Sequence, residues 1–190
     1  MASTPSKAQR LCLACGLCCD GALFKDVELR AAGEAARLSE LGLFLQTGRS
    51  RTRLPQPCAA LGAGCRCQIY ADRPSRCREF ECALLQAVNA GRMPSSDALR
   101  CIRRARQRAE QVRRLLRALG DRDEHVALSI RFRRLSRRVL EGTPAQGTAN
   151  LYSKLTLTMQ DLNVLLREKF LSSAEEGTRP KAAGGVGAVK

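Results

Sequence analysis

The sequence predicts a mainly α-helical protein, in which a small, irregular cysteine-rich module with short helices precedes an antiparallel helical extension. Three observations support this fold class. Nine of the ten cysteines lie within residues 12–82. Turn-forming residues such as Pro55, Gly62 and Pro74 interrupt the same region. Beyond residue 93, apolar side chains recur every three or four residues, which is the period of an amphipathic helix.

Two short helices and one or two strands are expected in the cysteine-rich module. Apolar residues spaced by three or four predict a helix over residues 26–41. Residues 44–54 are expected to contain a short strand or two. A second helix is expected over residues 78–90, where Gly91 and Pro94 would end it.

Three longer helices are expected in the extension. The first covers about residues 95–119, with two serines as N-caps and Gly120 at its end. The second covers about residues 123–140, and the third about residues 151–170. Each has one apolar face, so three such helices joined by short links can bury a shared seam.

The chain therefore divides into three segments. Residues 8–93 are predicted to form a cysteine-cluster domain, residues 94–171 an Arg-rich helical extension, and residues 172–190 a disordered tail. The tail is rich in alanine and glycine and lacks large apolar residues except valine. Such a segment cannot bury enough apolar surface to fold.

The cysteines are informative because nothing marks the chain for export. The N-terminal MASTPSKAQR lacks the apolar run of roughly 7–15 residues found in signal peptides, and no stretch approaches the ~18 apolar residues of a membrane helix. We therefore expect a cytoplasmic protein with no membrane association. Reducing cytosol disfavours structural disulfides, so many cysteines in such a chain indicate metal binding or redox chemistry.

The first cysteine group has the pattern Cys12-x-x-Cys15-x-x-Cys18-Cys19. A C-x-x-C step lets a tight turn present two thiolates to one metal, as in zinc knuckles. Three cysteines at two such steps are also the spacing that holds a 4Fe–4S cluster, with a fourth ligand from elsewhere. The adjacent Cys18 and Cys19 point apart in most backbone conformations. They therefore either serve different metals, or one is a ligand while the other packs.

The second group contains Cys58, Cys65, Cys67, Cys77 and Cys82. Cys77 and Cys82 lie at the start of a predicted helix, where exposed N–H groups and the helix dipole favour thiolates. A metal with four thiolates has a net charge of about −2, whether it is zinc or an oxidised 4Fe–4S cluster. The neighbouring Arg73 and Arg78 are candidates for offsetting that charge.

Together these residues resemble the bacterial CxxCxxCC cysteine-cluster family, the YkgJ-like proteins, whose domain is described as chelating zinc or iron. The resemblance covers about residues 10–85. It rests on the first cysteine run, on Cys58, and on the segment Cys67-x-Ile-Tyr-x2-Arg-Pro-x2-Cys77-Arg-x-Phe-x-Cys82. The resemblance implies eight metal ligands, which are Cys12, Cys15, Cys18, Cys19, Cys58, Cys67, Cys77 and Cys82.

The spacing leaves the metal and the number of centres open. Eight thiolates could fill two four-cysteine sites, or hold one cluster and leave a spare pair. The expected cofactor is zinc or an iron–sulfur cluster, because both accept four thiolates. Cys65 and Cys101 fall outside the family pattern. We expect Cys65 to be a spare thiol near the site, Cys101 to be a packing residue and His125 to lie on the surface.

The net charge of +15 suggests an anionic partner. Residues 100–138 contain fourteen arginines, most of them off the apolar lines of the predicted helices. They are expected to form a solvated basic face, or to bind an acidic protein or nucleic acid. No nucleic-acid module is visible, and aromatic residues for base stacking are scarce there.

We therefore predict a cytosolic protein that binds a metal ion or iron–sulfur cluster through eight cysteine thiolates, in a structural or redox-sensing role and without catalytic residues of its own. Two alternatives stay open. One is an S-adenosylmethionine-dependent protein lysine methyltransferase, because some proteins with a similar motif are flagellin lysine N-methylases. No cofactor loop is found in the extension. The other is a basic nucleic-acid-binding module in which zinc is only structural.

Overall fold

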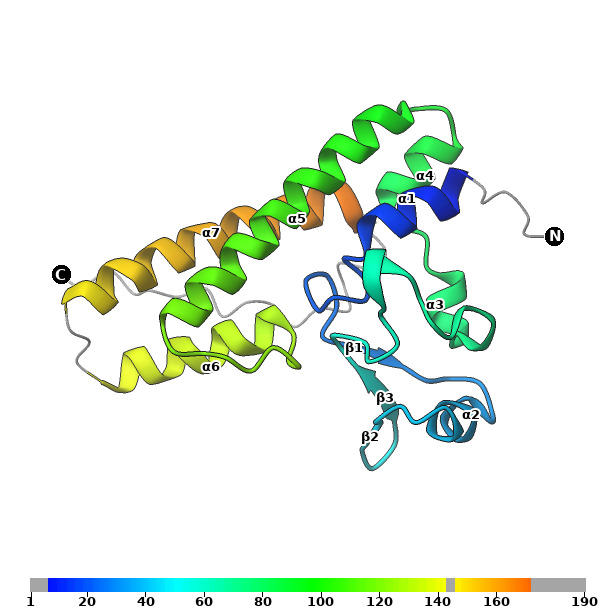
Figure 1. The fold of residues 1–190 in the computed structure, drawn as a ribbon, viewed down its shortest axis with the longest axis horizontal. Coiled ribbons are helices and arrows are strands. Elements are labelled where there is room, and N and C mark those ends of the chain that lie inside the picture. The colour runs from blue at the N-terminus through cyan, green and yellow to red at the C-terminus, as the bar shows by residue number, and fades with distance from the viewer. Residues whose placement is uncertain (1–6, 143–145, 172–190) are drawn as a thin grey trace.

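The computed structural model describes residues 7–142 and 146–171 of the chain (Figure 1). Within these ranges it contains seven α-helices and one three-stranded sheet, so the predicted mainly α-helical fold is confirmed. The tail over residues 172–190, which we expected to be disordered, lies outside the described residues.

Two long antiparallel helices run along the molecule, namely α5 (Ser95–Ala118) and α7 (Gln146–Phe170). They pack against each other along their length (Figure 1). Helix α6 (Leu128–Glu141) lies beside one end of α5, while α1 (Lys7–Cys15) and α4 (Ala83–Asn89) pack at the other. The cysteine-rich residues therefore lie against one end of the helical layer.

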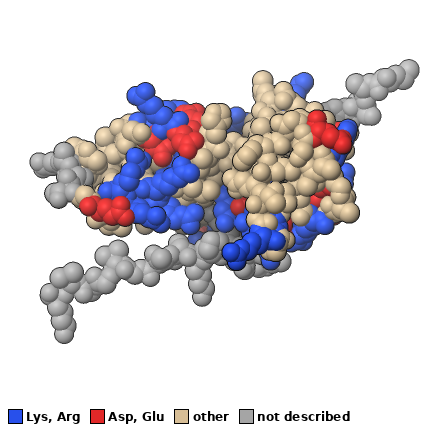
Figure 2. All heavy atoms as spheres, turned by 90° about the horizontal axis from the view of Figure 1, so that it is seen from below, with Lys and Arg blue, Asp and Glu red and all other residues tan. Residues whose placement is uncertain are grey.

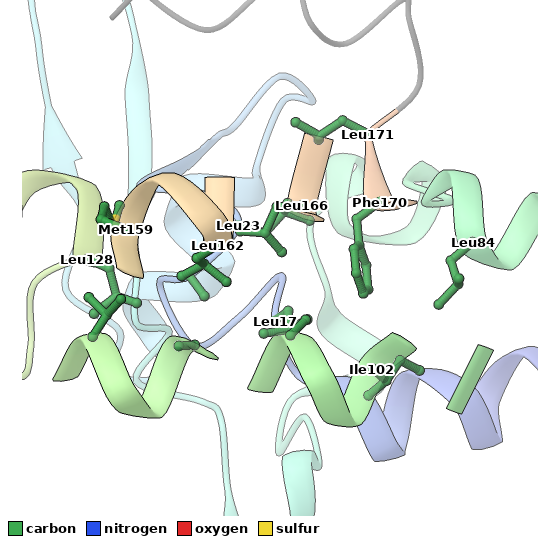
Figure 3. Packing of buried hydrophobic residues seen from close by; sticks show 14 of the residues in the cluster. Leu17, Leu23, Leu84, Ile102, Leu128, Met159, Leu162, Leu166, Phe170 and Leu171 are labelled. Atoms are coloured by element: carbon green, nitrogen blue, oxygen red, sulfur yellow. The ribbon is translucent and has the colours of Figure 1, made fainter. Parts of the chain in front are cut away.

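A single large cluster of buried apolar side chains joins these helices, and it extends from Leu11 to Leu171. Helix α5 buries a stripe of small and medium side chains along its length, in agreement with its predicted apolar face. Figure 3 shows Leu17 from the cysteine turn among side chains from α5 and α7. The division predicted at residue 93 falls between α4 and α5. It stays a prediction about sequence segments, and the core continues across it.

The small sheet lies on the other side of the cysteine-rich region. Its strand order is β1-β3-β2, and both pairs are antiparallel. The strands are β1 (Asp26–Glu28), β2 (Gln46–Thr47) and β3 (Thr52–Pro55), so strands are present where we expected them in residues 44–54. Helix α2 (Glu34–Glu40) buries Leu38 in a second, smaller cluster beside this sheet.

The helix predicted over residues 26–41 is wrong in its first half. Residues 26–28 form β1, where Val27 pairs with Leu54 of β3. Gly33 has a φ of 81°, a left-handed conformation that ends any continuous helix before α2 begins. The apolar spacing of this segment therefore mixed a strand residue with helix residues.

The helix predicted over residues 78–90 is divided into α3 (Ser75–Glu79) and α4. Phe80 and Cys82 have extended backbones, with ψ of 115° and 154°, so Cys82 caps α4 while Cys77 lies within α3. The two 3₁₀ turns η1 (Ala63–Cys65) and η2 (Tyr70–Asp72) precede α3. The cysteines that we placed at one helix start therefore belong to two helices.

The limits of the extension helices also differ from prediction. The two serines lie inside the first turn of α5, and Pro94 occupies the N-cap position. Helix α6 begins at Leu128, five residues later than predicted, and the N–H of Leu128 donates to the carbonyl of Gly21 at 3.0 Å. Helix α7 begins five residues earlier than predicted. No helix in the described part of the chain is long and apolar enough to cross a membrane.

The arginine-rich region forms a charged surface with both signs. Figure 2 shows basic side chains gathered toward the α6 end of the molecule, with acidic side chains between them. Arg117 bonds both Glu110 and Glu124, and Arg134 bonds Asp123. His125 is exposed, as predicted. Arg131 departs from the expected solvated face, because it is 1% exposed and bonds Asp121 at 2.8 Å inside the protein.

Candidate metal centre

A cavity of about 580 Å³ lies between the helical layer and the small sheet. All eight cysteines predicted as ligands line it, and Cys65 lines it as well. Its apolar wall includes Leu85, Ile102 and Phe170, which belong to the large core. Figure 3 shows Phe170 extending from α7 toward the side of Ile102 and Leu84. Residues from opposite ends of the described chain therefore enclose the same space.

The first cysteine run follows the end of a helix and a tight turn. Cys12 and Cys15 lie on α1, which ends where Gly16 adopts a φ of 68°. The N–H groups of Cys19 and Asp20 then donate to the carbonyl of Gly16 at 2.9 and 3.0 Å. This turn reverses the chain and places the adjacent Cys18 and Cys19 at the cavity.

A glycine is required at position 16 for a second reason. A Cβ added to Gly16 would lie 2.7 Å from Sγ of Cys65 and 3.0 Å from its Cβ. Cys65 itself has a positive φ of 61°. Arg106 of α5 donates to Sγ of Cys65 at 3.2 Å and to the carbonyl of Ala14 at 2.8 Å. Cys65 is thus packed against the first cysteine turn, in agreement with its predicted place near the site.

The second cysteine group is connected to the first by the backbone. The N–H of Cys58 donates to the carbonyl of Cys19 at 2.8 Å, and the carbonyl of Cys58 accepts from Leu61 at 2.9 Å. Leu61 forms an isolated bridge with Cys67. These contacts bring Cys19, Cys58 and Cys67 into one neighbourhood. Cys77 and Cys82 reach the cavity from α3 and from the start of α4.

Burial raises the pKa of several of the cavity thiols. It raises the pKa of Cys15 and of Cys19 to about 12, and that of Cys77 to about 11. Burial also raises the pKa of Cys18 well above its ordinary value. A metal that binds here as a thiolate complex must therefore displace protons from these groups.

The donor set fits a metal that prefers sulfur ligands. All ten cysteines are free of disulfides, and nine of them line one cavity. Zinc and iron–sulfur clusters both take four thiolates. Within residues 7–142 and 146–171, however, no three His, Cys, Asp or Glu side chains are grouped closely enough to hold a metal ion as they stand. The sulfurs would therefore have to converge on a bound metal.

Several arginines surround the cavity. Arg73 and Arg78, which we predicted to offset the charge of the centre, both line it, together with Arg66 and Arg76. The Arg73 guanidinium lies 3.7 Å from the centre of the Tyr70 ring. Burial raises the pKa of Cys12, and the positive charge of Arg73 lowers it by a smaller amount. Arg73 therefore stabilises a thiolate at this edge, while the role of both arginines toward a metal stays a prediction.

Sequence reasoning missed three features of the site. Arg113 of α5 bonds Asp20, directly after the cysteine run. Phe170 closes the apolar wall. Gln56 is 3% exposed beside the cavity, and its Oε1 is buried without a hydrogen-bond partner in the described structure. None of these residues belongs to the cysteine spacing. Cys101, in contrast, packs against the large core and does not line the cavity, as predicted.

Comparison with protein families shows to which family the chain is related. Residues 11–111, a little over half of the chain, match the family described as "CxxCxxCC: Putative zinc- or iron-chelating domain". The chain belongs to the CxxCxxCC family. The match extends beyond the last cavity cysteine into α5, the helix that packs against α1. No curated protein and no solved structure matches the chain. The expected cofactor class, zinc or iron, agrees with the description of the family.

Proposed function

We propose that this protein binds zinc or an iron–sulfur cluster through the eight cysteines that line the cavity. The supporting observation is that residues as distant as Cys12 and Cys82 place free thiols on one cavity. Cysteines that served only for packing would be expected inside a close-packed core and not around a cavity. Buried free thiols with raised pKa values are also poor nucleophiles, because the thiolate is the reactive form.

The metal would link structural elements that otherwise make few contacts with each other. The cysteines come from α1, the turn after it, the irregular segment around Cys67, α3 and the start of α4. A bound metal supplies strong, directional bonds among these short elements, which bury little apolar surface of their own. This favours a structural role. A redox-sensing role would apply where the metal is an iron–sulfur cluster.

The experiment is anaerobic purification of the full chain, followed by measurement of zinc, iron and acid-labile sulfide per chain and by an absorption spectrum. We expect either colourless protein with zinc, or brown protein with iron and sulfide in equal amounts. The variant Cys101→Ala should retain the same metal content, because Cys101 does not line the cavity. Soluble, folded protein without zinc, iron or sulfide would refute the proposal.

A further inference from the structure

We infer that the eight cysteines form two separate four-thiolate centres. One consists of Cys12, Cys15, Cys18 and Cys82. The other consists of Cys19, Cys58, Cys67 and Cys77. This assignment rests on the metal-binding function proposed above and goes further, because it specifies the number of centres and the ligands of each.

The first set lies on the helical side of the cavity. Cys12 and Cys15 are three residues apart on α1, so they share one face of that helix. Helix α1 contacts α4, and Cys82 is the residue that caps the start of α4. Cys15, Cys18 and Cys82 all pack against the large core. Their common support is therefore the helical layer.

The second set lies on the side of the sheet. Cys19 and Cys58 are joined by a backbone hydrogen bond of 2.8 Å, and Cys67 is brought beside Cys58 by the bridge to Leu61. Cys58 packs against the smaller core. Helix α3, which contains Cys77, contacts strand β1 at the edge of the sheet. Within this set, only Cys19 is connected to the helical side, through the turn that follows α1.

The division falls between the adjacent Cys18 and Cys19. Cys18 packs against the large core, whereas the carbonyl of Cys19 is bonded to Cys58. The effect of the thiols on one another's pKa values follows a similar division. Besides burial, the pKa of Cys19 is raised by Cys58, Cys77 and Cys67. Besides burial, that of Cys15 is raised by Cys82 and Cys12. Besides burial, the pKa of Cys18 is raised by Cys15, Cys82 and Cys12 of its own set and also by Cys19, its neighbour in the chain. Apart from this adjacent pair, these influences follow the two sets.

The charge of the cavity lining is compatible with two centres. Four thiolates around a divalent metal leave a net charge of about −2, so two such centres place about −4 in one enclosed space. Four arginines line that space, which are Arg66, Arg73, Arg76 and Arg78, together with one carboxylate, that of Glu81. The positive charge of the arginines offsets the repulsion between neighbouring anionic centres.

The assignment is tested by removing ligands within one set and across both. Metal content per chain is measured after anaerobic purification for the variants Cys15→Ala and Cys77→Ala, for the same-set double variant Cys15→Ala/Cys82→Ala, and for the cross-set double variant Cys15→Ala/Cys77→Ala. Cys101→Ala is the matched control. We expect each single variant and the same-set double variant to retain half of the wild-type metal. The cross-set variant should retain none, and the control should retain all of it.

A single shared centre predicts a different result, because Cys15→Ala and Cys77→Ala would then each remove all of the metal. If one of the two sets bound no metal, the variant in that set would remove none of the metal. Either result overturns the two-centre assignment and leaves the proposed metal-binding function intact. Wild-type protein without metal refutes that function itself.

A measurement on the unaltered chain covers the case in which a variant does not fold. Metal-free protein is titrated anaerobically with Co²⁺ alone, and the absorption of thiolate-bound Co²⁺ is followed. We expect saturation at two equivalents per chain, with the intense bands of tetrahedral sulfur coordination for both. Saturation at one equivalent would contradict two centres.

Discussion

Arg113 of α5 donates to the carboxylate of Asp20 at 2.8 Å and to the carbonyl of the same residue at 3.1 Å. Both side chains are about four-fifths buried, and Asp20 directly follows Cys19. The long helix therefore holds the turn that presents Cys18 and Cys19. This contact joins residues 93 positions apart, so it fixes the cysteine run against the extension.

Replacing Arg113 with alanine should weaken the retention of metal. The turn after Cys19 would lose both hydrogen bonds from Arg113, and the largely buried Asp20 carboxylate would keep the N–H of Ala22 but lose its cationic partner. Residues that orient metal ligands typically change metal affinity by about 10-fold or more, so we expect release to a chelator to be faster by about that factor. The exposed Arg114 is the control, and Arg114→Ala should release metal at the wild-type rate. Equal rates for the two variants would contradict this role of Arg113.

Gly16→Ala should be more destabilising than Gly64→Ala. Both glycines have a positive φ, of 68° and 65°, so both variants suffer a left-handed penalty of about 1 kcal/mol. Only at Gly16 would the new Cβ meet Cys65, whereas nothing lies within 4 Å at Gly64. We expect a further loss of about 1–3 kcal/mol for Gly16→Ala, measured by urea unfolding. Adding Cys65→Gly should recover most of this difference, and failure to do so would argue against the clash.

Asp121→Ala should strongly destabilise the fold. Arg131 is 1% exposed, and it donates to the Asp121 carboxylate at 2.8 Å and to the Asp121 carbonyl at 3.0 Å. Without the carboxylate the guanidinium would be buried with its charge unpaired, which typically costs about 3–5 kcal/mol. Asp123→Ala removes the exposed partner of Arg134 and should have a much smaller effect. Thermal unfolding of both variants tests this, and similar melting temperatures would contradict it.

Glu34→Gln should loosen the contact between α2 and α3. One oxygen of Glu34 accepts from the N–H groups of Arg30 and Ala31, and the other accepts from the N–H of Ser75 at the start of α3. A glutamine can accept on one side only, so an N–H group would lose its partner at a cost of about 1–3 kcal/mol. Urea unfolding at neutral pH measures this. Glu40→Gln on the same helix is the control.

The difference in the free energy of unfolding between wild type and Glu34→Gln depends on pH through the pKa of Glu34. Burial acts to raise this pKa, but the hydrogen bonds from Ser75, Ala31 and Arg30 outweigh it and lower the pKa below the ordinary value of 4.5. A lowered pKa stabilises the fold above the unfolded value, and this stabilisation is lost as the pH falls through the folded value. The gap between wild type and Glu34→Gln should therefore be constant between about pH 8 and pH 6. A gap that closes within that interval would contradict the assignment.

Chelation of the metal should affect the two sides of the molecule differently. The segments around Cys67 and Cys77 contain short helices and turns with few buried side chains, whereas α5 and α7 share the large core. We expect amide hydrogen exchange to accelerate in residues 16–20 and 58–82 when metal is removed, and to stay slow in the centre of α5 and α7. Uniform acceleration along the chain would show that the metal supports the whole fold.

The sequence predicted elements whose stability comes from a long, regular apolar face. Helices α5 and α7 bury such faces against each other, so their period is visible along the chain. The same reasoning wrongly predicted a helix in the segment before α2. Val27 has helical spacing to later residues, but it lies in a strand and pairs with Leu54. Leu54 lies 27 positions from Val27 in the chain, so no local sequence pattern indicates this pairing. Short elements stabilised by distant contacts were therefore the ones predicted wrongly.

For the site, the spacing of the cysteines was enough to identify the family and the thiols that face one cavity. It could not reveal Arg113 or Gln56, whose places depend on how α5 and the sheet meet the cysteine turn. The break between α3 and α4 was also hidden, because Cys77 and Cys82 have a spacing that fits one helix. That break places the two cysteines on two different helices.

The presence of Phe170 in the cavity wall has a consequence for the order of events during translation. The ribosome delivers the cysteine run first and the end of α7 about 150 residues later. Until α7 has emerged, the thiols face water on the side that Phe170 later closes. Metal taken up before then would sit in an open and exchangeable site. Its enclosure therefore waits for the emergence of a helix that contributes no cysteine.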